Sequence, residues 1–262
     1  MVPLPPETLF VGGVFLASAL ALAVGTAVFL PDRTLRSLAR EFLSTDWKYI
    51  GVAWAVTYAV NEVARRFHAD RMFTESVYEV EGTAVAVFQT VTSPRLTLFF
   101  TGAYLVGFPF VVLFTYFKLK AHDEQEAHRY ALAYVALVLL AVPFFLLFPV
   151  RIPSLYVAEV RPLMLDVSPV VRAGIFATDT LVKAFPSLHT GLSVLAALYA
   201  RSVGGRYARF AAVLAFVVVL STLYLGVHWL TDALFATMLV APAYYLSRRV
   251  DPDRVLRLPA RR

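Results

Sequence analysis

Residues 208–247 read ARFAAVLAFVVVLSTLYLGVHWLTDALFATMLVAPAYYLS, two long apolar runs joined by a short polar turn. Each run is close to the roughly 20 residues that an α-helix needs to cross a bilayer. The titratable residues of the joining turn are His228 and, four positions later, Asp232. This stretch therefore predicts a pair of membrane-spanning helices with polar chemistry at one end.

The rest of the chain extends this pattern over all 262 residues. Hydrophobic residues make up 59% of it and charged residues only 16%, whereas soluble domains carry about 25% charged residues. Further apolar segments cover residues 9–30, 47–64, 96–117, 130–149 and 186–201, which with 208–226 and 229–247 make seven. The sequence predicts one all-α domain over residues 1–262, a polytopic membrane helix bundle with about seven spans. The first segment is too long for a signal-peptide core, so we expect it to be retained as a span.

Basic residues predict how the bundle is oriented. They form four clusters, within residues 33–48, 118–129, 201–209 and 248–262. Seven spans with the N-terminus outside place all four clusters in the cytoplasm, as the positive-inside rule requires. This predicts a multi-pass cell-membrane protein with a cytoplasmic C-terminus and with both His189 and His228 on the extracytoplasmic face. The net charge of +6 then reflects topology and anionic headgroups, and we expect no nucleic-acid partner.

Two stretches between the spans are too polar to cross the membrane. Apolar residues recur at helical spacing over about 76–92, which predicts an amphipathic helix in the outer interface, either a packing element or a lid. The long loop at 150–185 mixes apolar residues with cations. We expect this loop to lie on the outer leaflet or to dip into it.

The spacing of His228 and Asp232 suggests chemistry at the end of the last helix. Residues four apart share a helix face. An Asp that accepts the imidazole Nδ1–H leaves Nε2 as a nucleophile or base. The alternative is a His–Asp pair that only holds two helices together.

A second histidine begins the fifth apolar segment. Pro186 and Ser187 are common at helix starts, but they do not explain His189 on an otherwise apolar helix. Cations on the same predicted side are Arg151, Arg161 and Lys183. Two histidines, an aspartate and cations on one face suit phosphoryl transfer, in which a nucleophile, a proton donor and cations act together on one phosphate.

These motifs resemble two conserved blocks of the type 2 phosphatidic acid phosphatase (PAP2) superfamily. Pro186-Ser187-Leu188-His189 is similar to its PSGH block, and residues 221–232, STLYLGVHWLTD, are similar to its SRxxxxxHxxxD block. The resemblance covers about residues 130–247, the expected catalytic core, and implies a six-helix type of core. It implies that His228 attacks phosphorus, that Asp232 orients His228, that His189 protonates the leaving group and that Ser187 binds phosphate. No metal and no cofactor are implied.

Three departures from those blocks point to one branch of the superfamily. Leu188 stands at the Gly position of the PSGH block, and Thr222 stands at the Arg position of the SRxxxxxHxxxD block. The superfamily has one more block, KxxxxxxRP, which precedes the other two. This sequence matches it only at Arg161-Pro162, with Arg151 as a substitute for its Lys. These features resemble the inositol phosphorylceramide synthase branch, which implies transfer of a phosphorylated headgroup from a lipid to an alcohol acceptor.

The sequence leaves several functions open. The leading prediction is an enzyme that takes a lipid phosphate from the bilayer and works through a phosphohistidine, with a lean toward the headgroup phosphotransferase. The first alternative is a phosphatase of polyprenyl or glycerolipid mono- or diphosphates. A non-enzymatic transporter or scaffold is the second alternative, because intramembrane His and Asp also serve as proton relays. A zinc enzyme using His189, His228 and Asp232 is the third. The chain has no cysteine, which excludes thiol catalysis and disulfides.

Overall fold

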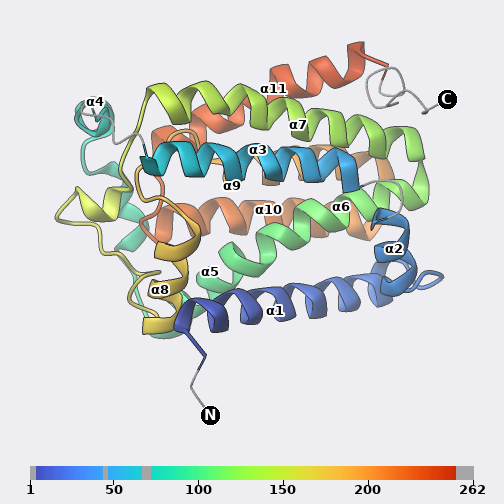
Figure 1. Ribbon diagram of the computed structural model, residues 1–262, viewed down its shortest axis with the longest axis horizontal. Coiled ribbons are helices and arrows are strands. Elements are labelled where there is room, and N and C mark those ends of the chain that lie inside the picture. The colour runs from blue at the N-terminus through green and yellow to red at the C-terminus, as the bar shows by residue number, and fades with distance from the viewer. Residues whose placement is uncertain (1–3, 44–46, 67–71, 252–262) are drawn as a thin grey trace.

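The computed structural model describes residues 4–43, 47–66 and 72–251. All seven predicted segments are helical there, and the prediction of an all-α bundle is confirmed. Six of them form the single helices α1 (Pro6–Phe29), α3 (Trp47–Arg66), α7 (Glu124–Leu147), α9 (Leu188–Ala200), α10 (Gly205–Tyr224) and α11 (Leu230–Arg249). The remaining segment is divided into α5 (Pro94–Gly102), η3 (Ala103–Gly107) and α6 (Phe108–His122). Figure 1 shows these helices lying lengthwise beside one another.

Four helical stretches are long and apolar enough to cross a bilayer among the described residues. They are Pro6–Phe29, Pro94–His122, Glu124–Leu147 and Gly205–Tyr224. The helices α3, α9 and α11 belong to the same bundle, but they are shorter or less apolar than these four. Several apolar helices therefore support a multi-pass membrane protein, and seven spans stays the prediction of the sequence.

The third segment contains a π-helical turn, η3, between α5 and α6. Ser93 begins α5 by accepting a hydrogen bond from the Leu96 amide, and Pro94 occupies the first turn. A π-turn contains an extra residue and so changes which side chains face inward beyond it. The side chain of Tyr104 in this turn is buried, and it points to the site described below.

The segment predicted as one amphipathic helix over 76–92 is two shorter helices. These are α4 (Thr74–Glu81) and η2 (Ala84–Gln89), separated at Gly82, which has a φ of +58°. The apolar residues at helical spacing do not form a buried face, because Val80 and Val87 are exposed, whereas Val85 between them is fully buried. Glycine tolerates positive φ, so the helix ends where the chain must turn to bury Val85.

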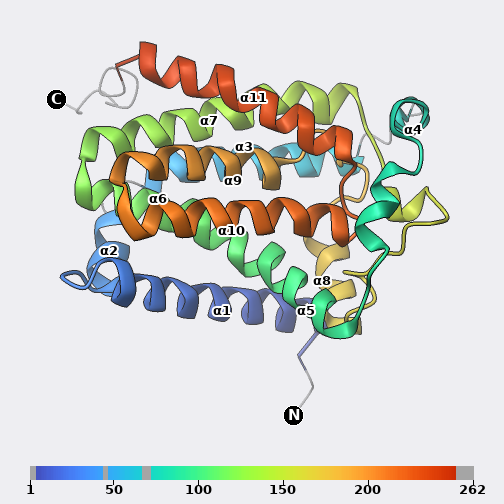
Figure 2. The same ribbon diagram turned by 180° about the vertical axis from the view of Figure 1, so that it is seen from behind.

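The loop at 150–185 is also more ordered than its sequence suggests. It contains η4 (Pro153–Leu155) and the ten-residue helix α8 (Pro169–Thr178). An isolated β-bridge joins Val150 to Lys183 near its two ends. Figures 1 and 2 show α4 and α8 together at one end of the bundle, and α2 (Leu35–Glu41) at the other.

The helix α9 occupies the middle of the bundle, packed against α6, α7, α10 and α11. Buried aromatic side chains such as Phe114, Tyr130 and Tyr199 fill the core around it. Toward the α2 end, Arg248 makes a two-pronged ion pair with Glu126. The basic clusters that the topology prediction uses therefore meet at the end opposite to α4 and α8, except for residues 252–262 and 44–46, which lie outside the described residues.

Candidate active site

The turn between α10 and α11 places His228 at the α4 and α8 end of the bundle. Gly226 in this turn has a φ of +71°, and a Cβ added there would lie 2.8 Å from the Arg161 carbonyl oxygen. The Thr222 carbonyl accepts hydrogen bonds from the amides of both Val227 and His228, each at 3.2 Å. Glycine is thus required by backbone conformation and by close approach, and the turn delivers His228 just before α11.

The imidazole of His228 is held through its Nδ1 atom. Nδ1 lies 2.8 Å from the Ala184 carbonyl oxygen and 3.3 Å from Oδ2 of Asp232. A carbonyl oxygen can only accept a hydrogen bond, so Nδ1 carries the proton and donates it. In the neutral ring, Nε2 then keeps its lone pair, which is the form a nucleophile or base requires.

Asp232 is fully buried in the first turn of α11. Its Oδ2 also accepts a hydrogen bond from the Trp229 amide at 2.8 Å. Its Oδ1 has no hydrogen-bond partner among the described residues. A buried carboxylate beside an imidazole favours the imidazolium or a phosphorylated ring, because the negative charge is close and poorly screened.

The two ends of the long loop hold the carbonyl that fixes His228. The Ala184 amide donates to the Val150 carbonyl at 3.0 Å. Next along the chain, the Arg151 carbonyl accepts a hydrogen bond from the indole of Trp229 at 2.7 Å. Trp229 is fully buried, so the loop and the start of α11 form one rigid support for the imidazole.

His189 faces His228 from the first turn of α9. Their ring centroids are 6.1 Å apart. Tyr104 from η3 stacks on the imidazole of His189 at 4.0 Å and 21°, and Phe108 contacts it at 4.3 Å. These rings restrict the orientation of His189, which sequence spacing alone did not indicate.

Both histidines line a cavity of about 420 Å³, within the range typical of ligand sites. Lys183 also lines it, with its ammonium 4.9 Å from the ring of Phe145. The acidic side chain in the wall is Asp179. Apolar and aromatic residues form most of the remaining lining, including Phe10, Val14, Trp54, Tyr58, Leu105, Tyr134, Ile175 and Leu188.

The predicted phosphate ligands are placed differently from one another. Lys183 lies in the cavity wall with the histidines, whereas Ser187 is fully buried as the cap of α9, where its hydroxyl accepts from the Thr190 amide. Arg151 and Arg161 are exposed and are not among the residues that line this cavity. Their backbone groups contact residues around the site instead. The Arg151 carbonyl accepts a hydrogen bond from the Trp229 indole. The amide and carbonyl of Arg161 are both hydrogen-bonded to the Gln89 side chain. Phosphate binding by Lys183, Ser187, Arg151 and Arg161 stays a prediction.

Sequence reasoning missed Glu81, the last residue of α4. Its carboxylate accepts hydrogen bonds from the amides of Leu230 and Thr231 and from the Thr231 hydroxyl. Negative charge at a helix N-terminus is stabilising, so Glu81 fixes the end of α11 that carries Asp232. The available signal was a carboxylate within the predicted amphipathic segment. That signal does not identify a partner about 150 residues away.

No group of three or more His, Asp and Glu side chains is arranged as a metal site within the described ranges. The His228–Asp232 pair and His189 form instead a two-histidine arrangement around a cavity with one lysine. Such an arrangement can attack an electrophile with one ring and donate or accept a proton with the other.

The similarity to known proteins covers most of this chain. Residues 79–246 match the sequence profile of the PAP2 superfamily, a longer region than the 130–247 expected from the two motifs. The crystal structure of Aquifex aeolicus LpxE superposes with a TM-score of 0.53 at 18% identity, covering 65% of this chain and 96% of that one. At this identity the likeness shows a shared fold. Among proteins of curated function, none matches the chain.

Proposed function

The chain belongs to the PAP2 superfamily, and on that premise we propose that it is a membrane-embedded lipid phosphate phosphatase that acts through a phosphohistidine on His228. One observation carries the proposal. His228 donates from Nδ1 to the Ala184 carbonyl, beside the buried carboxylate of Asp232, and its ring stands 6.1 Å from that of His189. This leaves Nε2 of one ring as the nucleophile and the other ring as the proton carrier.

The first step forms a phosphorus–nitrogen bond. Nε2 of His228 attacks phosphorus while the bond between phosphorus and the lipid oxygen breaks, and the electron pair leaves with that oxygen. Protonated His189 gives its proton to the departing oxygen, which becomes the lipid alcohol. The carboxylate of Asp232 stabilises the positive charge on the phosphorylated imidazole.

The second step returns the enzyme to its starting state. Neutral His189 takes a proton from water as the water oxygen attacks phosphorus. The phosphorus–nitrogen bond breaks, its electron pair returns to Nε2 of His228, and inorganic phosphate leaves. Atoms and protons then balance over the cycle, since His189 regains the proton that it gave away.

Phosphate is held in this proposal mainly by Lys183 and by α9. The first amides of a helix have no partner within the helix, and they favour anions. Leu188 and His189 lie in the first turn of α9. Their backbone amides are therefore at the same helix end as the His189 imidazole, which carries the proton. The exposed side chains of Arg151 and Arg161 would take part only through rearrangement of the loop.

A headgroup phosphotransferase of the inositol phosphorylceramide synthase kind is the second candidate. The charges in the cavity wall favour it, because Lys183 is accompanied by Asp179, and this pair suits a phosphodiester with one negative charge. Thr222, at the position of the family arginine, turns its hydroxyl to the Val219 carbonyl of its own helix. In this reaction an alcohol takes the place of water in the second step.

The test is phosphate release and trapping by purified protein in detergent. Inorganic phosphate released from a lipid phosphate without an added alcohol supports the phosphatase. Headgroup movement only with an alcohol present supports the transferase. We expect rapid quenching with a 32P-labelled substrate to leave acid-labile label on the protein.

Replacing the nucleophile gives the sharpest prediction. His228→Ala should lower turnover about 10⁴-fold or more and abolish the trapped label. The matched control is His122→Ala, an exposed histidine at the end of α6, which should leave both unchanged. Near-normal turnover in His228→Ala, with the protein folded by size-exclusion chromatography, would contradict the phosphohistidine scheme.

A further inference from the structure

The cavity that holds the histidines extends away from them between two N-terminal helices. Phe10 and Val14 of α1 form part of one wall, and Trp54, Thr57 and Tyr58 of α3 form part of another. Both helices precede residue 79, where the match to the superfamily begins. This half of the cavity is therefore built by residues that the family match does not cover.

The two helices are anchored on different neighbours. The helix α1 packs chiefly on α8, with Phe10 so close to Gly174 that a Cβ there would lie 2.0 Å from the ring. The helix α3 packs on α7, where the Trp54 indole donates to the Tyr134 hydroxyl at 3.1 Å. Figure 1 shows α3 and α1 on separate sides of the bundle, with α8 near one end of both. The cavity can thus open sideways between them without unpacking either.

The chemistry of the cavity changes along its length. Lys183 and the two histidines lie beside the start of α9 and the turn between α10 and α11, and both of these lie at the end of the bundle that carries α8. Trp54 lies twelve residues before the end of α3 at Arg66, about 18 Å along the helix axis, near mid-depth for a hydrocarbon core of about 30 Å. Trp54 and Tyr58 are 53% and 67% exposed, so apolar rings border the opening at hydrocarbon depth. A ligand that fits is anionic at one end and apolar along the other.

We propose that lipid phosphates reach His228 sideways from the bilayer between α1 and α3, with the hydrocarbon chain bound along Phe10, Val14, Trp54 and Tyr58. The proposal rests on the proposed function, and it deepens that function by naming where the lipid enters and which residues bind its hydrocarbon chain. The enzyme selects phosphate esters of long-chain lipid alcohols over short, water-soluble ones. The apolar half of the cavity supplies this selectivity, and the lysine and histidines act on the phosphate.

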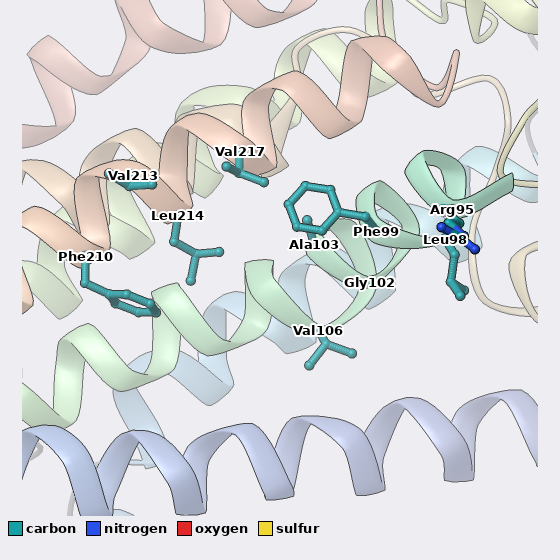
Figure 3. Close-up of a pocket in the computed structure, with 10 residues that line it drawn as sticks. All are labelled: Arg95, Leu98, Phe99, Gly102, Ala103, Val106, Phe210, Val213, Leu214 and Val217. Atoms are coloured by element: carbon teal, nitrogen blue, oxygen red, sulfur yellow. The ribbon is translucent and has the colours of Figure 1, made fainter. Parts of the chain in front are cut away.

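A larger apolar groove on another face does not meet these requirements. It has a volume of about 680 Å³ and runs between α5, η3 and α10 (Figure 3). Arg95 lies at one end, and residues such as Phe99, Val213 and Leu214 line the rest. It shares no lining residue with the cavity of the histidines. A lipid in this groove would therefore not bring its phosphate to His228.

The two faces provide a matched pair of variants. Val14→Trp narrows the opening between α1 and α3, and Val213→Trp makes the same substitution in the groove of Figure 3. Phosphate release is measured from a long-chain alkyl phosphate in micelles and from p-nitrophenyl phosphate. For Val14→Trp we expect kcat/KM to fall about tenfold or more on the long-chain ester, mainly through KM, and to change less than about twofold on the short ester. Thr57→Trp, from the opposite wall, should behave in the same way.

The outcomes separate this inference from the proposed function. Equal losses on both esters, or the same loss in Val213→Trp, would overturn the lateral route. A second measurement does not depend on turnover: an alkyl phosphate with a diazirine at the chain end should cross-link to peptides of α1 and α3, and Val14→Trp should reduce this labelling. Labelling there in a protein that releases no phosphate would keep the route and refute the phosphatase. Turnover without labelling of either helix would refute the route alone.

Discussion

The N–H group at Nδ1 of His228 has two hydrogen-bond acceptors, which differ in their distance and in their charge. The Ala184 carbonyl is the nearer, at 2.8 Å, and carries no formal charge. Asp232 is farther, at 3.3 Å, and already accepts the Trp229 amide. We infer that Ala184 is sufficient to fix the tautomer, while Asp232 mainly contributes the charge that stabilises a positive ring.

This division predicts an intermediate effect for Asp232→Asn. The tautomer is retained through Ala184, but the negative charge beside the phosphorylated imidazole is lost. We expect kcat to fall about 10²- to 10³-fold, the usual loss when one electrostatic stabiliser is removed, with KM little changed. Steady-state kinetics of the purified variant would measure this. A loss as deep as that of His228→Ala would show that Asp232, and not Ala184, fixes the ring.

Residue types and spacing pointed to three side chains that the structure brings together, but not to the groups that hold them. His189, His228 and Asp232 stand out because charged or titratable groups are rare in apolar helices. Ala184 does not stand out, because every residue has a carbonyl and only the pairing of residues 150–152 with 181–184 selects this one. Tyr104 reaches His189 only because the π-turn η3 directs its ring there and because α6 packs on α9.

At the scale of elements, the turn between α10 and α11 depends on a single small residue. Gly226 combines positive φ with contacts of 2.8 Å to the Arg161 carbonyl and 2.9 Å to Cβ of Ser154 for any added Cβ. Gly204 has a similar φ of +62°, but a Cβ there meets nothing within 4 Å. An alanine at Gly204 therefore meets only the cost of a positive φ, whereas an alanine at Gly226 also meets a steric clash.

Gly226→Ala should therefore be more damaging than Gly204→Ala. At Gly204 the backbone has φ +62° and ψ −164°, a conformation that costs a residue with a Cβ about 1–3 kcal/mol, and we expect this cost alone there. At Gly226 the clash should further lower the thermal unfolding midpoint in detergent and reduce turnover, because the turn that carries His228 must shift. Equal midpoints for the two variants would mean that the loop relaxes away from Gly226 without cost.

Apolar length predicted the helices well, since burying backbone polar groups in a bilayer requires helices whatever the local propensity. Their interruptions were not predictable in the same way. The break at Gly82 and the helix α8 arise where residues pack onto neighbouring elements, as Val85 and Ile175 do in the core. Helical spacing over 76–92 indicated helical structure, but it identified neither the fully buried residue of the segment, Val85, nor the division into two helices.

At the scale of the whole molecule, the two ends of the bundle differ in charge and in chemistry. The start of α9 and the turn between α10 and α11, which carry the two histidines, lie at the end with α4 and α8, and the described parts of the basic clusters lie at the other (Figures 1 and 2). Lys118 at this basic end donates to the Phe29 carbonyl at 2.8 Å, which joins the end of α6 to that of α1. Anionic headgroups and the positive-inside rule favour a cytoplasmic position for this end.

The absence of cysteine from the sequence makes the orientation directly testable by single-cysteine labelling. Glu159 is exposed in the loop near the cavity, and Ser202 is exposed between α9 and α10 at the basic end. If the active site is extracytoplasmic, a membrane-impermeant maleimide should label Glu159→Cys in intact cells and should label Ser202→Cys only after permeabilisation. The reverse pattern would place the histidines on the cytoplasmic side, and the substrate would then have to come from the inner leaflet. Retained phosphate release in both variants confirms that the labelled proteins are folded.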